Sequence, residues 1–191
     1  SWILPAHDTY LNVFYGKKHE VDLAAAAFVH ELAETLYFLD DKISEPVRQA
    51  VIDSMYVRAF NPVKDALQTG KGYTFNWFNN TNNWNAVCLA GVTSAAVGVI
   101  KDRKERALFV AAAEYYSQNS VLGYTDDGYC TEGLGYFNYG FQHYIILREQ
   151  LYQRTKGTID LFKSEKMKKI AMYGINFEII NGAYPAFADC R

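Results

Sequence analysis

The stretch Asn82–Ile100, NNWNAVCLAGVTSAAVGVI, decides the fold class. It carries no charged residue, and beyond Asn85 it consists of apolar and small side chains. Asparagine is a favoured residue just before a helix, because its side chain accepts a hydrogen bond from a free backbone N–H group. The stretch therefore predicts a buried helix that begins at Asn82 or Asn83 and ends near Ile100.

The segments on either side of this helix also have helical patterns. Pro46 follows a possible cap and starts a helix that we expect to end near Phe60, because Pro62 disfavours continuation. Asp102 and Glu105 have the spacing of a capping box. The expected helices span residues 21–39, 45–60, 83–100, 102–120, 134–154 and 164–180. No segment alternates as a strand would, so we predict one all-α domain, residues 1–191, built from stacked helical hairpins.

Composition excludes several classes of partner. The 191 residues carry a formal net charge of −2 and no basic stripe, which argues against a nucleic-acid partner. No apolar run is long enough to cross a bilayer, so no membrane partner is expected. The three cysteines, Cys88, Cys130 and Cys190, lie far apart and form no CxxC pair, so we expect no metal site and no cofactor. The first and last residues read like the middle of a protein, and we expect a fragment of a longer chain.

The stretch 127–140, DGYCTEGLGYFNYG, is the strongest functional signal. Its glycines indicate turns or a close approach of the backbone, and its tyrosines supply flat apolar faces with a hydroxyl at the tip. Together with fifteen tyrosines in the whole chain, this composition is typical of a carbohydrate cleft. It also suits a phenol that transfers protons.

A second polar segment, residues 79–85, contains five asparagines. Asn82 and Asn83 stand at a predicted helix start, where their amides join the free N–H groups and the positive end of the helix dipole. That arrangement would receive a carboxylate. Capping alone explains one asparagine but not five.

Tyr136 and Tyr139 lie three residues apart on one predicted helix, and His143 follows four residues later. A tyrosine needs a nearby cation or donor to act as a base, because the phenol pKa is near 10. The alternative is that the three rings pack this helix against its neighbour. Trp84 and Trp77 are candidates for stacking on a sugar ring, although either is compatible with a core position.

Glu132, with Asp126 or Asp127, is a candidate acid/base pair for glycoside hydrolysis. A carboxylate at a helix start also serves simply as a partner of the helix dipole. His7, His19 and His30 show no metal-ligand spacing, and we expect them to be structural.

Two of these segments resemble the heparinase II/III-like polysaccharide lyases. The similar residues are 82–88, NNWNAVC, and the 127–140 stretch, in an order and helical context like the family's central region. Residues 2–6 and 184–189 resemble its flanks more weakly. The resemblance implies an incomplete (α/α) toroid, a β-rich domain elsewhere in the same protein, and cleavage of acidic polysaccharides by β-elimination. It also implies a periplasmic or secreted location.

The resemblance assigns a role to two residues. Tyr136 matches the tyrosine that delivers a proton to the leaving glycosidic oxygen, and Asn83 matches the asparagine that neutralises the uronate carboxylate. Asn82, Trp84, Glu132, Tyr139 and His143 are the further candidates for substrate binding. Two positions depart from the family pattern: Trp84 stands where several members have histidine, and Val87 where some have glutamate. A glycoside hydrolase using Glu132 and Asp127, or a non-catalytic glycan-binding domain, are the alternatives.

Overall fold

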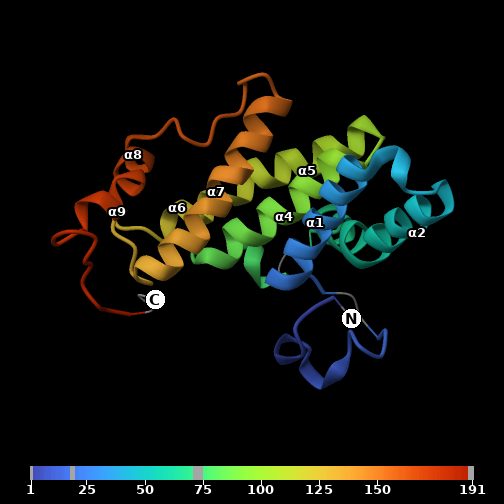
Figure 1. The fold of residues 1–191 in the computed structure, drawn as a ribbon, viewed down its shortest axis with the longest axis horizontal. Helices are drawn as coiled ribbons and strands as arrows, with labels where there is room; N and C mark the ends of the chain where they lie inside the picture. The colour runs from blue at the N-terminus through green and yellow to red at the C-terminus, as the bar shows by residue number, and fades with distance from the viewer. Residues whose placement is uncertain (1, 18–19, 71–74, 189–191) are drawn as a thin grey trace.

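The computed structural model describes residues 2–17, 20–70 and 75–188, and it is all-α over them (Figure 1). Extended pairing within these residues is limited to two isolated bridges, Tyr124–Cys130 and Ile180–Ala183. The helices are α1 Leu23–Leu39, α2 Glu45–Met55, α3 Asn61–Gln68, α4 Asn83–Val99, α5 Arg103–Tyr116, α6 Gln118–Leu122, α7 Leu134–Arg154, α8 Glu165–Ala171 and α9 Tyr173–Asn176. Shorter helical turns are Pro5–His7, Thr9–Leu11, Asp40–Lys42, Asn76–Phe78 and a π-helical turn Tyr56–Phe60.

Helix α4 is the centre of the fold and packs against α1, α5 and α7. Fourteen of its seventeen residues are buried, which explains why the sequence carries no charge there. Gly91 allows α1 to approach closely, because a Cβ at this position would lie 2.3 Å from the Ala26 carbonyl oxygen. Gly98 lies opposite Ala33, where a Cβ would make an ordinary contact at 3.9 Å; since both pairs advance by seven residues, α1 and α4 run parallel.

Side chains cap the first turns of α1 and α4, and the segment before α7 contacts the start of α4. The side chain of Asp22 caps α1 by accepting from the Ala25 N–H at 2.8 Å, and that of Asn82 caps α4 by accepting from the Trp84 N–H at 3.2 Å. Glu132, just before α7, hydrogen-bonds to the first residue of α4. The carboxylate before α7 therefore lies at the positive end of α4.

The predicted boundaries are right for α4 and α7, and wrong in three other places. The helix expected to stop near Phe60 continues into α3, because the backbone stays helical at Phe60 and Asn61 and a wider π-helical turn, closed by the Asn61 N–H on the Tyr56 carbonyl, comes directly before Pro62. The expected helix 102–120 is divided at Ser117 into α5 and α6. The last expected helix, 164–180, is shorter and is divided at Met172.

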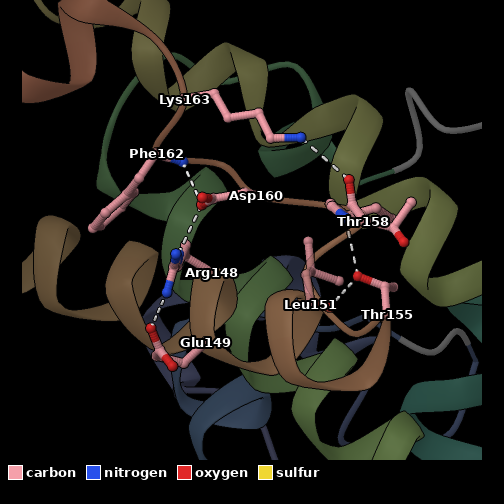
Figure 2. Close-up of polar contacts among 9 residues, drawn as sticks. Arg148, Glu149, Leu151, Thr155, Thr158, Asp160, Phe162 and Lys163 are labelled. Atoms are coloured by element: carbon pink, nitrogen blue, oxygen red, sulfur yellow. Dashed lines mark hydrogen bonds and ion pairs between the residues drawn. The ribbon is translucent and has the colours of Figure 1, made fainter.

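Arg148 on α7 binds the segment that follows this helix. Its Nε donates to Asp160 Oδ1 at 2.8 Å, and a second guanidinium nitrogen bonds to Glu149 (Figure 2). Asp160 Oδ1 also accepts from the Phe162 N–H at 3.0 Å. The guanidinium lies 4.0 Å from the centre of the Tyr152 ring, which adds a cation–π contact.

Candidate functional site

Asn83 and Glu132 form the polar centre of the candidate site. The Asn83 backbone N–H donates to Glu132 Oε2 at 3.2 Å, and Asn83 Nδ2 donates to Glu132 Oε1 at 3.2 Å. Gly133 has φ 91°, a conformation open to glycine, and it turns the chain so that Glu132 faces α4. The start of α4 thus holds a carboxylate with two donors, one from the backbone and one from an amide.

One atom of this centre has no hydrogen-bond partner in the described residues. Asn83 is 7% exposed, and its Oδ1 is buried and unpaired. The same holds for the hydroxyl of Tyr144, whose pKa is raised far above its ordinary value by burial. Buried polar atoms are normally paired, and both of these residues line one cavity, where a water or a ligand donor would pair with Asn83 Oδ1.

A small cavity brings these groups together. Its lining residues are Thr81, Asn82, Asn83, Ala86, Ser120, Gly123, Tyr124, Cys130, Glu132, Tyr136, Gly140 and Tyr144. Its volume of about 20 Å³ holds a water molecule but no sugar ring. Gly140 is required here, because a Cβ at that position would meet the Asn83 Cβ at 3.0 Å.

Four of the residues singled out in the sequence therefore share one cavity: Asn82, Asn83, Glu132 and Tyr136. Tyr136, in the first turn of α7, is 39% exposed and thus reachable from solvent. Asn82 acts as the cap of α4 as well as lining the cavity. The donors of Asn83 are occupied by Glu132 in this structure, so a uronate carboxylate could reach them only by replacing that side chain.

Tyr139 and His143 do not line this cavity. They contact one another, with ring centroids 4.9 Å apart, and His143 Nδ1 donates to the Tyr139 carbonyl oxygen at 2.7 Å. A carbonyl oxygen only accepts, so Nδ1 carries the proton. Burial raises the pKa of Tyr139, and nearby Cys88 and Asp22 raise it further. This pair faces the side of the core next to α1 and α4.

Trp84 points away from Asn83 and packs on His7, with ring centroids 4.9 Å apart. His7 Nδ1 lies 2.6 Å from Asp22 Oδ2. Sequence analysis gave His7 only a structural role and did not single out Asp22. His7 and Asp22 are 15 positions apart in the sequence. Local spacing therefore could not predict their contact with each other or the contact of His7 with Trp84.

The other candidates lie apart from the cavity. Asp127 is exposed and accepts a hydrogen bond from the Thr125 hydroxyl, which lowers the pKa of its carboxyl. Trp77 is 2% exposed, and its Nε1 donates to the Val21 carbonyl oxygen at 2.8 Å. It is therefore a core residue rather than an open stacking surface.

Within the described ranges, no three histidine, cysteine or acidic side chains are grouped so that they could hold a metal ion. Cys88 and Cys130 are buried free thiols, and Cys190 lies outside the described residues. Among the described helices, none is both long and apolar enough to cross a membrane.

Comparison of the sequence with protein-family models and with curated proteins finds no match to either.

Proposed function

We propose that this chain is the helical part, an incomplete (α/α) toroid, of a polysaccharide lyase that cleaves uronate-containing glycans by β-elimination. One observation carries the proposal: Asn83 already holds a carboxylate through two donors at a helix start, and Tyr136 lines the same cavity. The parallel course of α1 and α4 supports a toroid. A secreted or periplasmic location and a partner β-rich domain follow from the same proposal.

In the proposed reaction, the uronate carboxylate takes the place of the Glu132 carboxylate on Asn83. Neutralising this carboxylate stabilises the enolate-like intermediate that forms when the deprotonated Tyr136 oxygen takes the C5 proton and becomes a hydroxyl. The C5–H electron pair becomes the C4=C5 double bond, and the C4–O bond breaks. The Tyr136 hydroxyl gives its proton to the leaving oxygen. Because the cavity is only water-sized, Glu132 must swing outward before a sugar ring enters.

The test is the near-ultraviolet absorbance of the unsaturated product formed from heparan sulfate, chondroitin or alginate. We expect Tyr136→Phe to lower kcat by about 10²–10⁴, the usual contribution of a proton-transferring side chain. Tyr115→Phe is the matched control, since Tyr115 is 74% exposed on α5. Wild-type activity in Tyr136→Phe, or no absorbance rise with any acidic glycan, would contradict the proposal.

A second candidate function is glycoside hydrolysis with Glu132 as the acid. The position of Glu132 in the cavity with Asn83 favours it, whereas the exposed Asp127 is not among the residues that line the cavity. Glu132→Gln separates the two functions. A hydrolase would lose about 10²–10⁴ in rate and would produce reducing ends without a double bond. For the lyase we expect kcat within about threefold of wild type, because Glu132 transfers no proton in that reaction and a neutral amide competes less with the uronate.

A further inference from the structure

A second and much larger cavity lies at the opposite end of α4 from Asn83. Its volume is about 560 Å³, within the range of roughly 300–1,000 Å³ for small-molecule sites. The C-terminal parts of α1 and α4, helix α2 and the start of α5 surround it, on the side of the molecule away from α8 and α9 (Figure 1). Val97 in its wall follows Asn83 by fourteen residues, or about 21 Å of helix. No described residue lines both cavities, so this one is a separate site.

Aliphatic side chains form part of the wall of the second cavity. Leu36 at the end of α1, and Val97 and Ile100 at the end of α4, are each less than 10% exposed, and Ile52 on α2 is partly buried. These side chains carry no hydrogen-bonding group. They therefore favour a ligand with an apolar body, which leaves water when it binds there.

Gly98 leaves space in this cavity. Its backbone is helical, so no positive φ requires glycine at this position. Outside its own helix, a Cβ would meet one described atom within 4 Å, the Ala33 Cβ at 3.9 Å, which is an ordinary contact. Packing therefore does not require glycine either, although glycine is less favourable than alanine inside a helix. Gly98 and Ala33 both line the cavity, so a larger side chain at residue 98 would take up its space.

The acidic side chains of the lining are both beside Arg48. Asp40 Oδ1 lies 3.4 Å from one guanidinium nitrogen of Arg48, and Glu45 Oε2 lies 3.8 Å from its Nε. The third nitrogen donates to the Leu36 carbonyl oxygen at 3.2 Å. All three nitrogens of Arg48 are therefore engaged, and its charge is balanced within the protein.

Two further cations, Lys101 and Arg106, line the cavity without an acidic partner among the described residues. Arg106 donates Nη1 to the Ile100 and Lys101 carbonyl oxygens at 2.7 and 3.0 Å, and its other two nitrogens bond to no described group. Lys101 is exposed. An aliphatic wall next to two unpaired cations is complementary to a molecule with an apolar body and one anionic group.

We propose that the second cavity binds an amphipathic carboxylate of the fatty-acid type. Its alkyl chain lies against Leu36, Ile52 and Val97, in the space that Gly98 leaves, and its carboxylate binds Lys101 and Arg106. This binding activity goes beyond the proposed lyase function and does not depend on it.

Isothermal titration calorimetry of the full chain with three probes tests the two parts of the ligand separately. Decanoate has both parts, butyrate has the carboxylate with a short chain, and decyltrimethylammonium has the long chain with a positive head. We expect decanoate to bind at least about tenfold more tightly than either. It buries more methylene groups than butyrate does, and it has the charge that suits Lys101 and Arg106. A shift of the Gly98 amide resonance in NMR spectra should accompany its binding.

Two variants at Gly98 test the position of the alkyl chain. Gly98→Leu fills the cavity, and we expect it to weaken decanoate by about tenfold or more, with a melting temperature no lower than that of wild type. Gly98→Ala adds one methyl group, which meets only Ala33. We expect its affinity for decanoate to stay within about threefold of wild type.

A pair of lysine variants tests the position of the carboxylate. Lys101→Gln should weaken decanoate about two- to fivefold, as is usual for an exposed ion pair. Lys104→Gln is the matched control, because Lys104 is also exposed but does not line the cavity. We expect no change of affinity in the control.

Several results would overturn the site: wild-type affinity in Gly98→Leu, equal binding of decanoate and decyltrimethylammonium, or no decanoate binding up to its solubility limit. If Gly98→Leu melts below wild type, the lysine pair decides instead, and equal losses in Lys101→Gln and Lys104→Gln would overturn the site. Tyr136→Phe should bind decanoate like wild type. A loss there would place the ligand in the first cavity and would also contradict the proposal.

Discussion

Helix α7 carries a polar cluster at each end, and the two clusters differ in how completely their hydrogen-bonding groups are paired. At the C-terminal end, Arg148 bonds to Asp160 and Glu149 and stacks on Tyr152 (Figure 2). The Thr155 hydroxyl donates to the Leu151 carbonyl and accepts from a backbone N–H at 3.0 Å. Every group named here has a partner within the cluster.

At the N-terminal end, the pairing is incomplete. Glu132 receives both donors of Asn83, but Asn83 Oδ1 and the Tyr144 hydroxyl are buried without a partner in the described part of the chain. In the described part of the chain, four buried side-chain atoms have no hydrogen-bond partner. Two of the four, Asn83 Oδ1 and the Tyr144 hydroxyl, belong to residues that line this cavity.

The difference distinguishes polar groups that stabilise the fold from polar groups that are suited to binding a ligand. A cluster that only stabilises a structure satisfies its own atoms, because each unpaired buried group costs about 1–3 kcal/mol. A binding site leaves some hydrogen-bonding groups unpaired until its ligand binds. The comparison therefore indicates a stabilising role for Arg148 and Asp160, and it supports the proposal that the cavity at Asn83 binds a ligand.

The largest expected effect that tests this division comes from Asn83→Ala. It removes the amide that would bind the uronate carboxylate, and we expect the rate of unsaturated-product formation to fall by about 10²–10³. Its effect on the free energy of unfolding should be only about 1 kcal/mol, since one hydrogen bond and one unpaired atom disappear together.

The matched control for that variant is Asn119→Ala. Asn119 Nδ2 donates to the Phe78 carbonyl oxygen at 2.8 Å, at a position that does not line the cavity. We expect it to lose stability without losing activity, as measured by urea unfolding beside the absorbance assay. If the two asparagine variants lose activity equally, the N-terminal cluster has no special role.

The sequence was sufficient to predict the helices that carry these clusters. The uncharged residues of α4 are stable only in the core of a protein, so a buried helix could be predicted there. The capping residue Asn82 marked where this helix begins. The limits of α7 were also predicted correctly, since it begins after Gly133 and ends before Gly157. The continuation past Phe60 was missed because a proline normally ends a helix, whereas here a π-helical turn comes directly before Pro62 and the helix goes on.

The contacts of the site were much less predictable. Asn83 and Glu132 were each singled out from local patterns, but they are 49 positions apart, and their hydrogen bonds exist only because α4 and α7 pack together. The contacts of His7 with Asp22 and Trp84 were not predictable for the same reason, because the three residues meet only in the fold. Local spacing identifies residues with suitable chemistry, whereas tertiary packing decides which of them meet.

A smaller effect, on stability alone, is expected from Arg148→Ala. The guanidinium provides a charge-assisted hydrogen bond to Asp160 and a cation–π contact, and both side chains of the pair are 19% exposed. We expect the free energy of unfolding to fall by about 1–3 kcal/mol, with activity within about twofold of wild type.

Arg148→Lys refines this result, because lysine keeps the charge but not the planar fork that bonds and stacks at once. We expect it to recover less than half of the loss in urea unfolding. A large loss of activity in either variant would show that the C-terminal cluster shapes the site, and the division between the two ends of α7 would fail.

The smallest effect concerns pH and Asp160. The hydrogen bond from Arg148 lowers the pKa of Asp160, and the Phe162 N–H lowers it further. A carboxyl whose pKa is lower in the folded state contributes stability above its unfolded pKa of about 3.9, and this contribution is lost as the pH falls through the folded value. Asp160→Asn should therefore be less stable than wild type at pH 7 by about 1 kcal/mol or less, and the two proteins should converge in stability below about pH 4.

Urea unfolding between pH 3 and 7 measures the difference, with Glu149→Gln as the control, since Glu149 is 49% exposed. A constant gap between wild type and Asp160→Asn across that range would mean that the ion pair is not what holds the loop, and that the backbone contact to Phe162 and the stacked rings are sufficient.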